Sequence, residues 1–172
     1  MDPLMIVLRV LHIGAGVLWV GAAWVFFLFI GPAVRSLQPD AQHTFMGYLT
    51  RERRLTKVII AATIVTVGAG AALYWIVSGG LSQAWLSSPF GISITIGAVA
   101  AIVAFAMGPT IVSPAFERLA AIGAQVQASG GPPSEEQSNE LARVGSRLQK
   151  ALTLDSLLLA VAVFFMATAR YW

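Results

Sequence analysis

The sequence predicts an all-α fold: a four-transmembrane-helix bundle, built from two repeated helix pairs and extended by a cytoplasmic helical hairpin. Hydrophobic residues make up 57% of the 172 residues and charged residues only 11%, against about 25% charged in soluble domains. Four apolar stretches, at about 4–30, 55–78, 90–112 and 149–169, reach the roughly 20 residues that a bilayer crossing needs. A spanning segment must be helical because hydrocarbon offers the backbone no hydrogen-bond partner. We therefore expect residues 1–172 to form a single integral membrane domain.

The first stretch, about 4–30, is predicted to be a helix of the mature protein. It is longer and more aromatic than the apolar region of a signal peptide. It also lacks a basic leader and a small-residue cleavage site. We therefore count it as the first span.

The basic residues lie mostly on one side of the predicted bundle. Those in the first and third connections are Arg35, Arg51, Arg53, Arg54, Lys57, Arg118, Arg143, Arg147 and Lys150. The second connection, "SGGLSQAWLSSP", carries none, and aromatic residues such as Tyr74 and Trp172 mark the opposite edge. The positive-inside rule then places the basic side in the cytoplasm and both termini outside, in a bacterial-type inner membrane. Because this bias accounts for the sequence pI of about 9.8, we expect no nucleic-acid partner.

The first connection is predicted to contain an amphipathic cytoplasmic segment at 38–57. A helix can begin near Pro39, because proline is well tolerated in a first helical turn. The apolar residues spaced to share one face of it are Phe45, Met46, Leu49 and Leu55. We expect this segment to lead directly into the second span.

The third connection, about 113–148, is predicted to form a cytoplasmic helical hairpin. The third span continues as a helix through "PAFERLAAIGAQVQASGG", and "GGPPS" turns the chain. Ser134 and Gln137 have the spacing of a capping box for the returning helix. The apolar residues expected to meet across the hairpin are Leu119, Ile122 and Val126 with Leu141, Val144 and Leu148. At about 1.5 Å per residue, the hairpin would extend roughly 20 Å from the membrane.

The two halves of the chain resemble each other. "FLFIGPAVRSL" ends the first span and "AFAMGPTIVSP" ends the third. "RRLTKVIIAAT" opens the second span and "SRLQKALTLDS" opens the fourth. Because the matching segments run in the same direction, we predict a parallel repeat of two helix pairs.

The first half of the chain also resembles a known group of proteins. "LHIGAGVLWVGAAWVFFLFIGPAVRSLQPD", followed by a basic segment and "KVIIAATIVTVGAGAALY", is similar to the small CopD-like and DUF2269-like integral membrane proteins, and more distantly to the HemJ protoporphyrinogen-oxidase type. The likeness covers about the first 80 residues. It implies haem binding or copper handling, with His12 at the histidine position of the family.

The resemblance makes a tetrapyrrole, haem b or another, the candidate cofactor, with His12 as its axial ligand. Residues that would surround such a group are Trp19, Gly70, Gly97 and Met166. The other histidine, His43, lies in the predicted cytoplasmic segment, so a second axial histidine is not available. A metal is expected only as the centre of such a tetrapyrrole, because the methionines are too scattered for a copper site.

Close helix packing explains the same residues. Small side chains let membrane helices approach one another. A packing His12 would donate a ring N–H to a backbone carbonyl or a hydroxyl on a neighbouring helix, and Gly70 and Gly97 would admit that backbone. The pattern favours packing, and both interpretations remain open at this point.

Asp155 is the one acidic residue well inside a predicted span. An intramembrane carboxyl normally faces the bundle interior, where it can carry protons or bind a cation. The alternative is an ion pair with Lys57 or a neutral, hydrogen-bonded acid, and we favour this structural role. His12 and Asp155 are predicted in opposite membrane halves.

The sequence indicates no catalytic residue, since it has no phosphate-binding loop, no His/Glu metal spacing and no nucleophile beside a base. We expect a non-catalytic subunit within a larger membrane complex of the respiratory or photosynthetic type. The alternative is a haem- or chlorophyll-binding, cytochrome-like redox protein that uses His12. The expected partners are the lipid bilayer and other membrane subunits or further copies of the chain.

Overall fold

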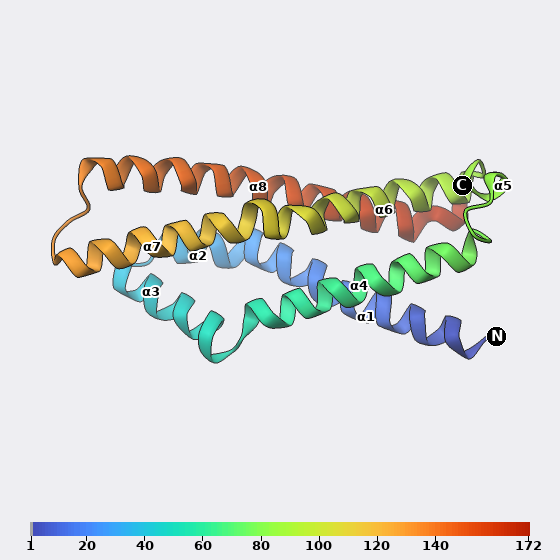
Figure 1. The fold of residues 1–172 in the computed structure, drawn as a ribbon, viewed down its shortest axis with the longest axis horizontal. Helices are drawn as coiled ribbons and strands as arrows, with labels where there is room; N and C mark the ends of the chain where they lie inside the picture. The colour runs from blue at the N-terminus through green and yellow to red at the C-terminus, as the bar shows by residue number, and fades with distance from the viewer. Residues whose placement is uncertain (1) are drawn as a thin grey trace.

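The computed structural model describes residues 2–172, and for residues 39, 40, 43 and 51 it describes the backbone alone. Within these residues every regular element is a helix, and four helices are long and apolar enough to cross a membrane (Figure 1). The first consists of α1 (Pro3–Val25), η1 (Phe26–Ile30) and α2 (Gly31–Arg35), and the second is α4 (Leu55–Val77). The third consists of α6 (Pro89–Met107), η3 (Gly108–Val112) and α7 (Ser113–Ser129), and the fourth is α8 (Glu135–Thr168). The all-α, four-helix prediction is confirmed, and the chain is a multi-pass membrane protein.

Shorter elements connect the spanning helices. They are α3 (Pro39–Gly47) and η2 (Tyr48–Glu52) before α4, α5 (Gln83–Leu86) before α6, and η4 (Ala169–Tyr171) at the end. We call the end of the bundle that carries α3, α7 and the start of α8 the basic end. The chain termini lie at the other end (Figure 1).

Three of the four spanning helices begin at a residue whose side chain caps the first turn. Asp2 accepts a hydrogen bond from the backbone N–H of Leu4 at 2.9 Å, and Ser88 accepts one from Gly91 at 3.0 Å. A proline follows each of these caps, in a position where its missing N–H costs nothing. The predicted capping box of Ser134 is present before α8.

The spanning helices pack in the cyclic order α1, α4, α6, α8, with α1 mainly against α4 and α6 mainly against α8. Each of the four interfaces contains a hydrogen bond from a side chain. These bonds join His12 to Thr66, Tyr74 to Thr95, Ser93 to Phe165 and Trp24 to Ser156. Such bonds help to fix the helices relative to one another. Lipid tails are as apolar as the side chains, so hydrophobic burial alone gives membrane helices little reason to associate.

The core lies where the four helices meet. It consists of Trp19 of α1, Ala62 of α4, Ala104 of α6 and Leu159 of α8. Within α1, all of whose residues the structure describes, Trp19 is the one buried side chain. The two alanines leave the space that the indole ring fills, so the core depends on one large residue.

Each half of the chain has a π-helical turn at its Gly-Pro. η1 ends directly before Gly31-Pro32, and η3 begins at Gly108-Pro109. Proline has no N–H to donate, and a wider turn accommodates the interrupted hydrogen-bond ladder. The shared feature and the packing of α1 on α4 and of α6 on α8 agree with the predicted repeat of two helix pairs.

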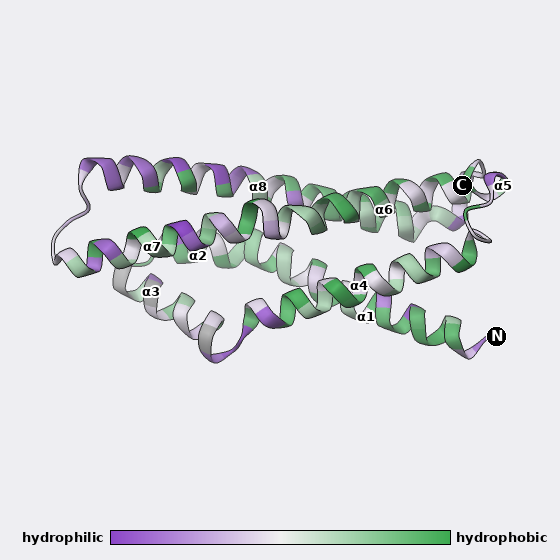
Figure 2. Ribbon diagram, viewed as in Figure 1, coloured by the Kyte–Doolittle hydropathy of each residue, from purple (hydrophilic) through white to green (hydrophobic). Residues whose placement is uncertain are grey.

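The predicted hairpin is formed by α7 and the first part of α8, which is strongly hydrophilic (Figure 2). Ile122 and Leu148, two of the residues expected to meet, are buried. Gly130 ends α7 with φ of 66°, a conformation that glycine adopts without strain. Arg118 donates to both carboxylate oxygens of Glu140 across the hairpin, at 2.8 and 2.9 Å.

The hairpin should loosen in acid. The hydrogen bond from Arg118 holds the pKa of Glu140 below its ordinary value. A carboxyl with a lowered pKa stabilises the folded state above its unfolded pKa, about 4.3 for Glu, and this contribution is lost as pH falls through the folded pKa. Glu140→Gln should therefore speed amide hydrogen exchange at 119–126 at pH 7, relative to wild type, and the difference should vanish in acid. Glu117→Gln, a neighbouring change outside the pair, should have no effect. Equal exchange in Glu140→Gln and wild type at pH 7 would contradict this account.

The amphipathic face predicted for 38–57 is wrong in part. Phe45 is exposed, whereas Met46 and Leu49 are half-buried, so Phe45 lies on a different face. Adjacent residues on a helix are separated by about 100°, so Phe45 and Met46 cannot point the same way. Tyr48, three residues after Phe45, shares its face by ordinary helical spacing, and this exposed aromatic pair is a feature that the sequence analysis did not predict.

Candidate functional site

His12 lies on α1 with its ring directed at α4. The ring nitrogen Nδ1 is 2.8 Å from the backbone oxygen of Thr66. Because a carbonyl oxygen can only accept, Nδ1 carries the proton and donates it. The lone pair of the neutral ring is then on Nε2. This hydrogen bond is the one expected of a packing histidine.

Gly70, one turn beyond Thr66, provides the space for the ring. A Cβ atom at Gly70 would lie 2.8 Å from Cε1 and 2.9 Å from Nδ1 of His12, closer than such atoms approach in proteins. Gly16, one turn beyond His12, faces Thr66 at ordinary contact distance. The glycines therefore bring α1 and α4 together around a histidine.

Gly70→Ala should destabilise the protein, because the new methyl group meets the His12 ring. Overpacking of this kind costs about 1–3 kcal/mol. The matched control is Gly68→Ala in the same helix, where a Cβ would meet nothing within 4 Å. We expect the thermal unfolding temperature in detergent to fall for Gly70→Ala and to stay the same or rise for Gly68→Ala. Equal unfolding temperatures for the two variants would show that the ring is not held in this position.

The second ring nitrogen of His12, Nε2, is not fully buried. Only Nδ1 is hydrogen-bonded to a residue that the structure describes. Among those residues, no fully buried side-chain nitrogen or oxygen lacks a partner. His12 as a whole is half-buried. Nε2 is therefore at least partly accessible, and with the proton on Nδ1 it keeps an unused lone pair.

The other residues predicted to surround a cofactor lie elsewhere. A Cβ at Gly97 would come within 2.9 Å of Met166 Cγ and 3.1 Å of the Ala162 oxygen, so α8 fills that position. Trp19 belongs to the four-helix core. The structure thus places His12 against Gly70, between α1 and α4. It places Met166 against Gly97, in the other helix pair, between α6 and α8.

A tetrapyrrole buried between the helices does not fit this arrangement. The two glycines that would make room for a flat ring are occupied by the side chains of His12 and Met166. What the residues offer instead is a single partly accessible nitrogen, His12 Nε2, without a hydrogen-bond partner among the described residues. A flat group could reach it only from outside the packed contact of α1 and α4.

Asp155 is half-buried on α8. The expected ion pair with Lys57 is absent from the part of the chain that the structure describes, and Lys57 is exposed. The carboxyl group has no hydrogen-bond partner among the described residues and is not fully buried. The adjacent Ser156 lies against Trp24, 12 residues along α1 from His12, or roughly 18 Å at 1.5 Å per residue. Asp155 and His12 therefore do not form one site.

Residues 2–172, apart from the undescribed side chains, contain no group of three His, Cys, Asp or Glu residues that could hold a metal ion. Comparison with family models, curated proteins and solved structures found no match to this chain. The resemblance to CopD-like and DUF2269-like proteins thus stays an expectation from the sequence. The hydrogen bonds of Ser93 and Trp24 were not predicted; the only signal for them was a hydroxyl and an indole inside apolar stretches.

Proposed function

We propose that this chain is a non-catalytic subunit of a larger membrane complex, and that a neighbouring membrane protein covers part of its α1 and α8 surface. The observation that carries the proposal is the pair of accessible polar groups in the spanning helices, His12 Nε2 and the Asp155 carboxyl. Lipid tails cannot hydrogen-bond either group. An unpaired carboxylate inside a span is costly, and a partner that hydrogen-bonds it removes part of that cost.

The exposure of α1 supports the same proposal. In the apolar window of the first spanning helix 6% of the residues are buried, against 33% in the third. The N-terminal end of α1 also stands apart from the ends of α6 and α8 (Figure 1). The first helix therefore has the most surface to offer a partner. The excess of arginine and lysine at the basic end favours an orientation with that end in the cytoplasm and both termini outside.

Asp155→Leu should release the partner and leave the chain folded. The carboxyl has no partner among the described residues, so its loss removes only contacts with the neighbouring subunit. A hydrogen bond to a charged group contributes about 1.5–3 kcal/mol, so the assembled fraction should fall at least about tenfold. Native gel electrophoresis of mildly solubilised membranes measures that fraction.

Two variants control this experiment. Asp155→Asn keeps hydrogen-bonding capacity and should retain more assembly than the leucine variant. Val99→Ala, at an exposed position of α6 outside the proposed interface, should leave assembly unchanged. A leucine variant that assembles like wild type, or that unfolds as an isolated chain, would count against the proposal.

A second candidate function is tetrapyrrole binding at the outer surface of α1 and α4. It is favoured by the hydrogen bond from His12 Nδ1 to Thr66, because that bond fixes the ring and leaves the Nε2 lone pair unused. Such a group would add electron transfer to the chain. A five-coordinate haem would give a high-spin absorption spectrum that His12→Ala abolishes, whereas the subunit proposal expects no pigment stoichiometric with the chain. Pigment that persists in His12→Ala would exclude His12 as a ligand.

A further inference from the structure

A pocket opens at the basic end, on the inner side of α3. The chain turns after α2, and α3 leads away from the bundle before α4 returns to it (Figure 1). The pocket is a shallow, open hollow of about 600 Å³, suited to a molecule that lies along the surface and is only partly enclosed. Its lining residues are Leu37, Ala41, Thr44, Phe45 and Tyr48.

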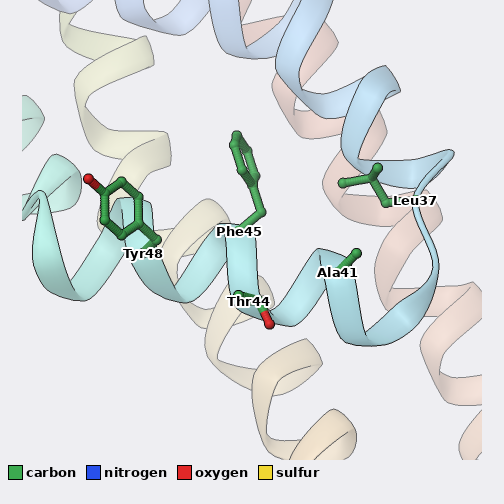
Figure 3. A pocket seen from close by; sticks show the side chains of 5 residues that line it. All are labelled: Leu37, Ala41, Thr44, Phe45 and Tyr48. Carbon is green, nitrogen blue, oxygen red and sulfur yellow. The ribbon is translucent and has the colours of Figure 1, made fainter.

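The lining is almost wholly apolar. Phe45 of α3 and Tyr48 of η2 project on the same side, and Leu37 lies in the turn between α2 and α3 (Figure 3). All three side chains are exposed, at 39%, 46% and 41% of their full area. Exposed aromatic and aliphatic groups of this size, next to a spanning helix, are suited to contact with hydrocarbon chains.

A positive charge lies beside the pocket, against its lining residue Tyr48. Arg53 Nε donates to the Tyr48 hydroxyl at 2.8 Å, and the guanidinium lies 5.2 Å from the centre of the Tyr48 ring. This contact uses one of the five N–H groups of the arginine and leaves its outer nitrogens available. Arg54 and Lys57 follow within one turn, and both are exposed. Segment 38–57 contains four basic and two acidic residues, so its net charge is positive.

The pocket lies at the level where a membrane surface is expected. It sits between Arg35, which ends the first spanning helix, and Leu55, which begins the second. Tyrosine and basic residues gather at this level in membrane proteins, next to the lipid headgroups. An apolar pocket beside an arginine thus matches a molecule with a hydrocarbon part and an anionic part.

We propose that this pocket binds an anionic phospholipid of the leaflet at the basic end. The upper part of an acyl chain lies against Phe45 and Leu37, and the headgroup phosphate contacts Arg53. The charge selects the lipid class, since each basic residue near an anionic surface adds about 1 kcal/mol. A second copy of the chain is a poorer occupant, because its own basic segment would be repelled. This proposal does not depend on the partner subunit.

Native mass spectrometry of the purified protein tests the proposal with two lipids of identical acyl chains, phosphatidylglycerol and phosphatidylcholine. Wild type should retain phosphatidylglycerol in preference to phosphatidylcholine. Arg53→Gln should weaken phosphatidylglycerol binding about fivefold and leave phosphatidylcholine unchanged. Phe45→Asn should weaken both lipids.

Arg9→Gln is the matched control, because it removes an exposed arginine near the other end of the bundle. It should change neither lipid. The proposal is overturned if Arg9→Gln and Arg53→Gln reduce phosphatidylglycerol binding equally, since charge alone would then explain it. It is also overturned if inorganic phosphate competes as well as phosphatidylglycerol, or if Phe45→Asn instead dissolves a dimer of the chain. Circular dichroism confirms that each variant remains helical before binding is compared.

Discussion

Trp19→Ala should lower the free energy of unfolding by about 3–5 kcal/mol, the usual cost of truncating a buried tryptophan. The indole lies between Ala62, Ala104 and Leu159, one residue from each of the other spanning helices. Alanines cannot move far enough to fill the resulting cavity. The loss should appear in reversible unfolding of the purified protein by a denaturing detergent.

Trp75→Ala is the matched control. Trp75 lies near the end of α4 and is 59% exposed, so its truncation should change stability by no more than about 0.5 kcal/mol. If the two tryptophan variants lost similar stability, the four-helix core around Trp19 would be refuted.

Gly97→Leu should prevent stable folding or reduce stability by more than the roughly 1–3 kcal/mol of ordinary overpacking. The first added carbon already meets Met166 and the backbone oxygen of Ala162, at 2.9 and 3.1 Å. A backbone atom in a packed helix cannot turn aside as a side chain can. The measurement is the yield of monodisperse protein and its thermal unfolding temperature.

The same change separates the packing and cofactor interpretations of Gly97. If Gly97 left room for a bound group, leucine would displace that group while the apoprotein still folded. Gly68→Leu is the control, since the space beside Gly68 is open. A well-folded Gly97→Leu that had lost a pigment would contradict the packed α6–α8 contact.

Hydropathy and capping were enough to predict most of the fold. The second predicted span, 55–78, coincides with Leu55–Val77, and the capping box at Ser134 is formed. These features depend on residues near one another in the chain. The length of an apolar run and the spacing of a cap can therefore be read locally.

The sequence predicted that a packing His12 would donate a hydrogen bond to a neighbouring helix, but not which residue would accept it. A ring N–H had to find an acceptor, but whether that was Thr66 depends on how α1 and α4 are rotated and shifted along each other. That register is set by Gly16, Gly70 and the core together. The pocket at Phe45 was missed because Phe45 was grouped with Met46 and Leu49, and not with Ala41 and Tyr48, which lie at helical spacing from it on the pocket side.

Site-specific photocrosslinking in the native membrane tests the central claim, that another protein covers the surface around His12 and Asp155. A photoreactive residue would replace Ile13 or Leu154, which are exposed neighbours of these two residues, and Val99, which is equally exposed on α6. We expect a protein adduct of one defined mass from positions 13 and 154, and none from position 99. When Asp155→Leu is combined with the photoreactive residue at position 154, the adduct should be lost. Adducts with lipid alone from positions 13 and 154, in membranes where the chain is abundant and folded, would contradict it.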